Sequence, residues 1–459
     1  KRSGGDSLAQ GRHHAASDED KFGHVRARGK PEELVKRDYK WTLSTSRPAT
    51  LPNMNELSGK HILLGLTGGI ACFKSAELCR ALVKEGATVQ VVMTDAAAQF
   101  ITPVTMQALS NRPVYTSQWD GREANNMPHI NLSRAADVML IAPCSADFVA
   151  QLVQGASSEL LSLMCLARPR ERVPLLLAPA MNREMWSHPA TQRNFAQAQA
   201  DGAVVLGVGT GEQACGETGD GRMLEAHELL DDLIAFFRPK SLVGQHVVVT
   251  AGPTFEAIDP VRGITNLSSG KMGFSIARAA KEAGARVTLV AGPVSLPTPR
   301  GVNRMDVRSA LEMQAAVMAQ VDAATVFVAT AAVADWRPAT ASDQKIKKDG
   351  SGQTPTLQFT ENPDILAGVA QLPRAKTGEL YCVGFAAESH DLVANATAKR
   401  ARKGVPLLVG NIGPATFGQD DNALLLVDAD GAREVPHASK RSLAIQLVAE
   451  IARRISHKA

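Results

Sequence analysis

Apolar runs alternate with amphipathic segments along the first half of the chain. HILLGLTG (residues 61–68) and TVQVVMT (88–94) are short apolar runs typical of buried strands, and the segment between them, residues 70–87, has helical spacing and is closed by Gly86. Three more runs predict strands: DVMLIAPC (137–144), PLLLAPAM (174–181) and AVVLGVG (203–209). Strands this apolar are covered by helices on both faces, so the pattern predicts a parallel-sheet α/β domain.

The alternation stops at residues 236–245, FFRPKSLVGQ, and then restarts. Beyond this break, SIARAAKEAGA (275–285) predicts a helix. Five apolar runs predict strands: HVVVTAGP (246–253), RVTLVAGP (286–293), TVFVATAAV (325–333), LYCVGFAA (380–387) and VPLLVGN (405–411). We therefore expect an α/β chain of two Rossmann-like parallel-sheet domains, residues 58–240 and residues 241–459.

Residues 1–57 mix charged and small polar residues without a helical or strand period, which predicts a disordered N-terminal extension. Its acidic residues Asp18, Glu19 and Asp20 argue against a transit peptide. Met54, just before the first apolar run, has the position of a natural start.

Composition narrows the functional classes. The chain of 459 residues has a hydrophobic fraction of 44% and a net charge of +4, and it lacks both a membrane-length apolar run and a basic cluster interleaved with aromatic residues. We therefore expect neither a membrane nor a nucleic-acid partner. The six cysteines form no CxxC pair or regular framework, which favours a reducing cytoplasm and argues against a zinc site.

Neither half carries a standard nucleotide fingerprint. GLTGG (65–69) and TAGPTFEAIDP (250–260) lack the GxGxxG spacing of dinucleotide-binding loops, and SSGKMG (268–273) lacks the first glycine and the hydroxyl residue of a P-loop. The stretch TNLSSGKMG (265–273) opens a predicted helix. Two interpretations stand side by side: an anion site on backbone N–H groups, or an ordinary N-cap by Ser268 or Ser269.

Longer motifs, taken together and in order, resemble a known family. GLTGGIACFKS, MPHINL, APCSAD, APAMNREMW and ACGETGDGRM resemble flavin-dependent cysteine decarboxylases, in particular phosphopantothenoylcysteine decarboxylase. TAGPTFEAIDPVRGITNLSSGKMG, AAVADWRP, KIKK, ENPDI and GFAAE resemble phosphopantothenate-cysteine ligase. Joined in one chain, they resemble the bacterial bifunctional coenzyme A biosynthesis family over about residues 55–456.

For the first half, the resemblance implies an N-terminal flavoprotein domain of the cysteine decarboxylase type that binds FMN. It implies catalytic roles for His129, Asn182 and Cys215, and a substrate contact for Met185. The implied FMN contacts are Gly68, Gly69, Ile70, Thr94, Ser145, Ala146, Asp147, Phe148 and Ala180. Asp147 stands where many members have Asn.

Cys215 lies in GEQACGETGDGRM (211–223), which is too rich in glycine for a helix and too polar for a core. The resemblance implies a mobile flap over the substrate, with Cys215 as the proton donor when the product of decarboxylation is reduced. A small residue that merely fills a loop would need no thiol.

For the second half, the resemblance implies a C-terminal ligase domain. CTP and Mg²⁺ activate the carboxylate of 4'-phosphopantothenate as an acyl cytidylate, and cysteine displaces CMP. Lys345 matches the lysine of the first step, and Asn266 matches the asparagine that turns over the intermediate. The implied CTP contacts are Ala329, Thr330, Ala331, Asp335, Lys345, Asn362, Pro363, Asp364, Ile365, Phe385, Lys399 and Lys403. Ile412 replaces a more usual acid, and no residue is assigned to the metal.

The family further implies a homo-oligomer, with FMN at a subunit interface and a possible dodecamer. One alternative is a regulatory FMN-binding protein without catalysis, like phosphatase-inhibitor relatives. His129, Asn182 and Cys215 in one chain argue against it, and Asn266 with Lys345 argues against an inert ligase half.

Overall fold

The computed structural model describes residues 55–347, 356–388, 391–412 and 418–456. Of the predicted N-terminal extension, residues 1–54 therefore lie outside the described residues. Leu57 is fully buried in the core of the first half, and its backbone N–H donates to the Glu85 carbonyl at 3.1 Å. Folded structure thus begins slightly earlier than the hydrophobic pattern indicates.

The first half is built on a parallel five-stranded sheet with the order β2-β1-β3-β4-β5. Its strands are β1 (His61–Leu66), β2 (Thr88–Met93), β3 (Val138–Cys144), β4 (Leu175–Pro179) and β5 (Val204–Val205). All five predicted strands are confirmed, although the last is only two residues long. The order is that of a flavodoxin-like sheet.

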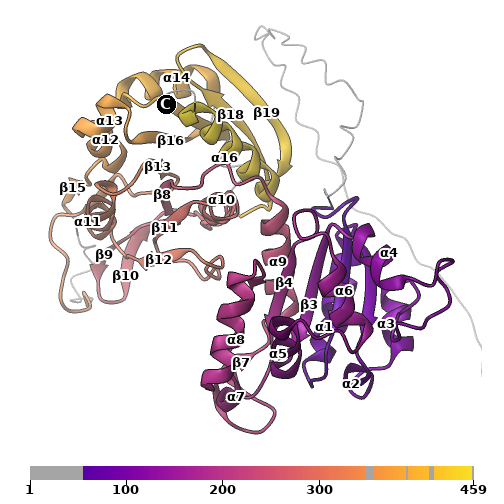
Figure 1. Ribbon diagram of the computed structural model, residues 1–459. Helices are drawn as coiled ribbons and strands as arrows, with labels where there is room; N and C mark the ends of the chain where they lie inside the picture. Colours follow the sequence, from indigo (N-terminus) through magenta and orange to yellow (C-terminus); the bar gives the residue numbers. More distant parts are fainter. Residues whose placement is uncertain (1–54, 348–355, 389–390, 413–417, 457–459) are drawn as a thin grey trace, which may run out of the picture. The chain divides into compact units, whose positions relative to one another are not determined.

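Helices cover both faces of this sheet, as Figure 1 shows. Leu78 of α1 and Leu229 of α9 pack in the core on one face, whereas Phe148 of α5 and Phe195 of α8 pack in the core on the other. The helices are α1 (Cys72–Lys84), α2 (Asp95–Ala98), α3 (Pro103–Ser110), α4 (Pro128–Ala135), α5 (Ala146–Gln154), α6 (Leu160–Ala167), α7 (Arg183–Ser187), α8 (Pro189–Ala200) and α9 (Ala226–Phe237).

The glycine-rich segment forms an antiparallel hairpin of β6 (Gly209–Glu212) and β7 (Thr218–Arg222). Its glycines permit close approaches: a Cβ at Gly221, where φ is 120°, would lie 2.6 Å from the Met181 carbonyl oxygen. The Gly221 carbonyl in turn accepts a hydrogen bond from Met181 N at 2.9 Å. The hairpin is therefore seated against the start of α7.

The second half contains an eight-stranded sheet with the order β12-β11-β8-β13-β16-β17-β18-β19. The first six strands in this order are parallel, and the last two are antiparallel. The strands are β8 (His246–Ala251), β11 (Arg286–Ala291), β12 (Asn303–Asp306), β13 (Val326–Ala329), β16 (Tyr381–Glu388), β17 (Leu407–Ile412), β18 (Asp421–Val427) and β19 (Ala432–Ser439). The five predicted strands are confirmed, and β12, β18 and β19 were not predicted.

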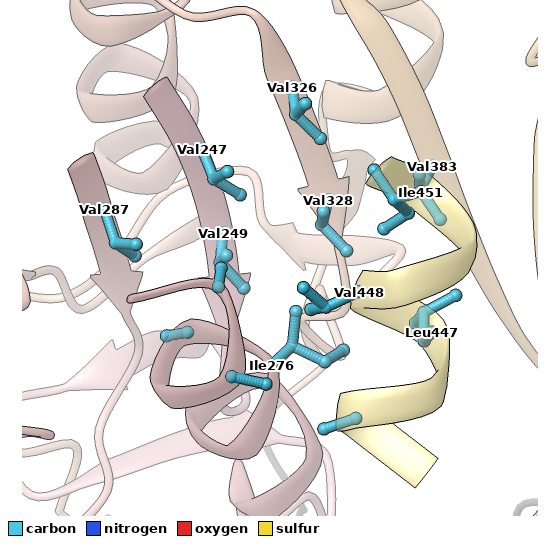
Figure 2. Close-up of a cluster of buried hydrophobic side chains, with 14 of the residues drawn as sticks. Val247, Val249, Ile276, Val287, Val326, Val328, Val383, Leu447, Val448 and Ile451 are labelled. Atoms are coloured by element: carbon cyan, nitrogen blue, oxygen red, sulfur yellow. The ribbon is translucent and has the colours of Figure 1, made fainter. Parts of the chain in front are cut away.

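Two helices cover one face of the second sheet. Figure 2 shows Ile276 of α10 and Leu447, Val448 and Ile451 of α16 against the sheet valines. Each fully buried side chain of this size contributes roughly 1.5–3 kcal/mol. The helices of this half are α10 (Lys271–Glu282), α11 (Ala310–Val321), α12 (Ile365–Ala370), α13 (Pro373–Thr377), α14 (Leu392–Lys403) and α16 (Lys440–Ser456). Two small two-stranded sheets pair β9 (Phe255–Asp259) with β10 (Arg262–Thr265) and β14 (Trp336–Pro338) with β15 (Phe359–Glu361).

Each sheet has a point where the strand order reverses direction. In the first sheet the reversal lies between β1 and β3, and in the second between β8 and β13, which gives the Rossmann order 3-2-1-4-5-6 over six parallel strands. Ligands of open α/β sheets bind in the crevice outside the carboxyl ends of the strands at such a reversal. The topology therefore locates one candidate site in each half.

We expect Gly273→Ala to destabilise the second half by roughly 1–3 kcal/mol because it overpacks the contact of α10 with the sheet. A Cβ at Gly273 would lie 2.5 Å from Ala251 Cβ and 2.6 Å from Thr330 Oγ1. Thermal unfolding would measure the effect. Gly368→Ala in α12 is the matched control: a Cβ there would meet no neighbouring atom within 4 Å, so stability should stay equal or rise. If Gly273→Ala and Gly368→Ala are equally stable, the tight packing of α10 against the sheet at Gly273 is contradicted.

Two candidate active sites

Hydrogen bonds from Thr67 join the loops after β1 and β3. The Thr67 hydroxyl donates to the Pro143 carbonyl at 2.8 Å and accepts from Ser145 N at 2.9 Å. Beside it, a Cβ at Gly68 would lie 2.7 Å from Ala96 Cβ, whereas the space around Gly69 is open. Ile70 is exposed despite its apolar side chain. The predicted FMN residues Gly68, Gly69 and Ile70 thus lie at an edge of the sheet where hydrogen bonds join two loops.

Two short polar side chains begin helices at this edge of the sheet. Thr94 Oγ1 accepts from Ala97 N, and Ser145 Oγ accepts from Phe148 N, both at 3.1 Å. Helix N-termini favour anions, as a flavin phosphate requires. Asp147, whose partner the sequence leaves open, accepts from Gln151 Nε2 at 2.7 Å within α5.

Two of the predicted FMN residues use their backbone N–H groups in hydrogen bonds within the fold. The Phe148 side chain is buried in the core, and its N–H is bonded to Ser145. The Ala180 N–H donates to the Cys144 carbonyl at 3.1 Å. Ala146 opens α5 beside them.

The hairpin brings Cys215 onto Asn182. Asn182 begins α7, where its Oδ1 accepts from Glu184 N at 2.8 Å and its Nδ2 lies 3.3 Å from the exposed Cys215 Sγ. Gln213 Oε1 accepts from Arg183 N at 2.9 Å, which fixes the hairpin on the same helix end. The two residues implied by the resemblance, 33 positions apart in sequence, therefore share one polar cluster.

Glu217 is a third member of this cluster that sequence analysis missed. Its Oε2 accepts from Asn182 Nδ2 and lies 3.5 Å from Cys215 Sγ. These hydrogen bonds, first from Asn182 and then from Cys215, lower the pKa of the Glu217 carboxyl. A glutamate two residues after a cysteine is an ordinary sequence feature. Its contact with Cys215 and Asn182 is evident only in the folded hairpin.

His129 and Met185 occupy separate places. His129 is half-buried in the first turn of α4, and in the described part of the chain no hydrogen bond joins it to Asn182 or Cys215. Met185 is exposed on α7, one turn after Asn182. The structure therefore groups Asn182 with Cys215 but does not bring His129 to them within one chain.

The residues of this half fit a phosphorylated flavin. The glycine approach at Gly68, the open backbone at Gly69 and the hydroxyl-capped starts of α2 and α5 follow the carboxyl ends of β1, β2 and β3, at the same edge of the sheet as the reversal. This edge offers donors for a phosphate and an exposed apolar side chain, Ile70, for a ring system.

The second half holds a cavity of about 860 Å³ at the reversal between β8 and β13. A cavity of this size suits a nucleotide together with a second substrate. Every predicted CTP residue except Lys345 lines it: Ala329, Thr330, Ala331, Asp335, Asn362, Pro363, Asp364, Ile365, Phe385, Lys399 and Lys403. Asn266 also lines it, and its Nδ2 donates to the Ala332 carbonyl at 3.0 Å.

The start of α10 opens on this cavity without a side-chain cap. The N-cap is Gly270, with φ of 75°, and neither Ser268 nor Ser269 caps the helix. The N-cap interpretation of TNLSSGKMG is therefore wrong, because the left-handed turn at Gly270 takes the cap position from the serines. The N–H groups of a helix of 12 residues face a cavity that can hold an anion.

Four lysines line the cavity: Lys271, Lys399, Lys403 and Lys440. Lys403 forms an ion pair with Asp364, and burial lowers the pKa of its ammonium despite the opposing effect of Asp335. Lys271 Nζ lies 2.6 Å from Asp420 Oδ1. Neither Lys271 nor Lys440 was predicted as a site residue. Lys440 reaches the cavity only through the fold of the distant α16.

Lys345 lies outside the residues that line the cavity. Its segment is tied to the β9–β10 hairpin: Ile346 N donates to Asp259 Oδ2 at 3.2 Å, and Arg262 Nη2 donates to the Ile346 carbonyl at 2.8 Å. The same hairpin leads directly into Asn266. Of the neighbouring lysines, Lys347 is exposed and Lys348 lies outside the described residues, as does the side chain of Ile412.

We expect Asp259→Asn to loosen the segment that carries Lys345. The buried Asp259 carboxylate accepts from Arg262 Nε at 2.9 Å, and the Arg262 bond, foremost among several, lowers the pKa of Asp259 to about 2. Without this charge, trypsin should cut after Lys345 and Lys347 several-fold faster. Asp306→Asn, which removes an exposed acid from β12, is the control. Unchanged cleavage in the Asp259 variant would contradict the anchoring role.

Within the residues that the structure describes, no group of three His, Cys, Asp or Glu side chains has a metal-binding arrangement. No helix in the same part of the chain is long and apolar enough to cross a bilayer.

Comparison with known proteins identifies relatives of both halves. Residues 50–238 match the family described as Flavoprotein, and residues 242–455 match the family described as DNA/pantothenate metabolism flavoprotein C-terminal domain. The chain is 50% identical over 394 residues to the Vibrio cholerae protein named Coenzyme A biosynthesis bifunctional protein CoaBC, an alignment that covers 85% of this chain and 97% of that protein. It is 46% identical over 407 residues to the Escherichia coli K12 protein of the same name, covering 88% and 99%.

One solved structure in the comparison is described as the C-terminal domain of Coenzyme A biosynthesis bifunctional protein CoaBC. It is 32% identical, has a TM-score of 0.41, and covers 48% of this chain and 99% of its own.

Proposed function

The chain belongs to the CoaBC family of coenzyme A biosynthesis bifunctional proteins, and from this premise we propose how its two sites work. As a member, it is a phosphopantothenate-cysteine ligase and a phosphopantothenoylcysteine decarboxylase. We assign the decarboxylase to residues 58–240 and the ligase to residues 241–459. The regulatory alternative is not favoured, because Asn182 and Cys215 are both present and in contact.

In the ligase half, we propose that CTP binds in the 860 Å³ cavity with its phosphates toward the start of α10 and the lysines Lys399 and Lys403. A carboxylate oxygen of 4'-phosphopantothenate attacks the α-phosphorus, and pyrophosphate leaves. The cysteine amine then attacks the acyl carbon, and CMP leaves. Asn266 faces the acyl group, and Lys345 assists the first step from its tethered segment. When bound with the triphosphate, Mg²⁺ would neutralise part of its charge.

In the decarboxylase half, we propose that FMN is held by Gly68, Gly69, Ile70, Thr94 and the start of α5. When bound, FMN supplies reversible two-electron oxidation and reduction of the substrate's cysteine moiety. The Asn182 amide donates to the substrate carboxylate and orients it for loss as carbon dioxide. His129 accepts a proton, and Cys215 donates its thiol proton to the substrate carbon during the final reduction.

The contact of Asn182 Nδ2 with Cys215 Sγ at 3.3 Å carries this assignment, because it brings the carboxylate-binding amide and the proton donor onto one substrate. Supplying phosphopantothenoylcysteine directly tests the decarboxylase by itself. Carbon dioxide should be released without CTP or Mg²⁺. Release that requires CTP would contradict the separation into two sites.

We propose that the chain assembles as a homo-oligomer, up to a dodecamer, in the cytoplasm. Ile70, a predicted FMN contact, and Phe73, one turn further on, are exposed although both are apolar, which supports a subunit contact there. His129, which lies apart from Asn182 within one chain, fits a site completed by a second subunit. Light scattering of the purified protein should give a mass of several chains.

A further inference from the structure

The segment between Tyr115 and α4 is held onto that helix by a chain of side-chain hydrogen bonds. It leads directly into the first turn of α4, where His129 lies. Glu123 joins two elements: its Oε1 accepts from the Tyr115 hydroxyl at 2.9 Å, and its Oε2 accepts from Asn131 Nδ2 of α4 at 2.7 Å. Asn131 Nδ2 also donates to Asn125 Oδ1 at 2.9 Å. The Glu123 carboxylate therefore bridges α4 and the residue that precedes the segment.

The far end of this bridge is fixed to the first sheet. Tyr115 is 7% exposed, and its carbonyl accepts from Met93 N of β2 at 2.9 Å. Burial and, after it, the bond to Glu123 raise the pKa of the Tyr115 hydroxyl, which therefore stays protonated and donates. Arg122 lies over the same ring, 4.2 Å from its centroid, and its Nη2 donates to the Val114 carbonyl at 2.7 Å. Glu123 thus connects α4 to a rigid edge of the sheet.

The same hydrogen bonds fix the start of α4. Its N-cap is Met127, whose side chain has no oxygen to accept from the N–H groups of the first turn. Asn125 Oδ1 instead accepts from Met127 N at 3.1 Å and from Asn131 Nδ2. Further along the helix Leu132 is buried in the core, whereas His129 is only half-buried. The first turn of α4 therefore depends on the polar bridge more than on core packing.

We propose that Glu123 is a positioning residue for His129: by holding Asn131, it fixes the first turn of α4 against the sheet and so sets the place of the imidazole. This inference rests on the proposed role of His129 as proton acceptor. A misplacement of about 1 Å can slow an enzymatic step on the order of 10²-fold. The substrate contacts proposed for Asn182 and Met185 lie on another helix, so loss of the bridge should lower kcat and leave KM unchanged.

The test is decarboxylation of added phosphopantothenoylcysteine by the full chain with FMN bound, in Glu123→Ala, Asn131→Ala and the double variant. We expect each single substitution to lower kcat roughly 10–100-fold at unchanged KM, and the double variant to be no slower than the slower single variant, because the two residues share one contact. Glu123→Gln keeps a carbonyl acceptor for Asn131 and should recover part of the loss. Glu171→Ala, which removes an exposed acid from the turn before β4, is the control and should match the wild type.

Unchanged kcat in both single variants, or losses that multiply in the double variant, would overturn the proposal. Trypsin cleavage after Arg122 reports the bridge without turnover, and Asn131→Ala leaves the sequence at this bond unchanged. Cleavage should be several-fold faster in that variant than in the wild type. Faster cleavage with unchanged kcat would refute the positioning of His129. Faster cleavage in a protein whose wild type releases no carbon dioxide would support the bridge and refute the proposed function instead.

Discussion

Replacing Cys215 with Ser is expected to reduce formation of the decarboxylated, reduced product by roughly 10²–10⁴-fold while leaving pyrophosphate release by the ligase unchanged. The hydroxyl keeps the size and hydrogen bonding of the side chain but is a far weaker acid than a thiol, and a lost general acid costs about this much. Cys215 is exposed on the hairpin, so replacing its sulfur atom leaves the hydrophobic core intact. The substitution should therefore affect the reaction and not the fold.

Single-turnover analysis of the product from added phosphopantothenoylcysteine would measure the effect. The ligase activity of the same preparation is the internal control for folding. Wild-type product formation by Cys215→Ser would exclude the thiol as proton donor, and loss of both activities would point to a folding defect.

Replacing Lys403 with Met is expected to lower kcat/KM for CTP by roughly 10–100-fold, the value of one charge-assisted hydrogen bond to a phosphate. Lys403 lines the cavity from the last turn of α14, and burial, the main cause of its lowered pKa, makes its charge costly unless a partner is present. In this structure Asp364 is that partner. A bound triphosphate would share or replace it.

Initial rates of pyrophosphate release at varied CTP would measure this effect. Lys376→Met, which removes an exposed lysine from α13, is the matched control and should retain the wild-type value. The decarboxylase reaction should be unaffected in both variants. If Lys403→Met and Lys376→Met have equal kcat/KM values for CTP, Lys403 does not contact the bound nucleotide.

The parallel strands were predictable because each is a short, continuous apolar run, as in residues 61–66 or 246–251. The edge strand β19 (Ala432–Ser439) was not, because it carries mostly exposed residues and Val435 is its buried position. Edge strands of this kind pair through the backbone, and their side chains give little periodic signal.

The residues of the candidate sites also divide into those that motifs predict and those that only the fold reveals. Asn182 and Cys215 could be named from motifs, but their contact depends on the hairpin folding back onto α7. Glu217 and Lys440 carry no local signal, and only tertiary structure brings them to a site. Phe148 matches a binding motif while its side chain is buried in the core, so its place in the FMN site stays a prediction. Motifs therefore locate a site, and the fold decides which side chains enter it.

The most direct test of the account is one reaction mixture of purified protein with 4'-phosphopantothenate, cysteine, CTP and Mg²⁺, in which pyrophosphate and carbon dioxide are followed together. The account predicts that both are released in equal amounts, that carbon dioxide appears after pyrophosphate, and that 4'-phosphopantetheine accumulates. A flavin-containing protein that releases neither product would contradict the enzymatic assignment and favour a regulatory role.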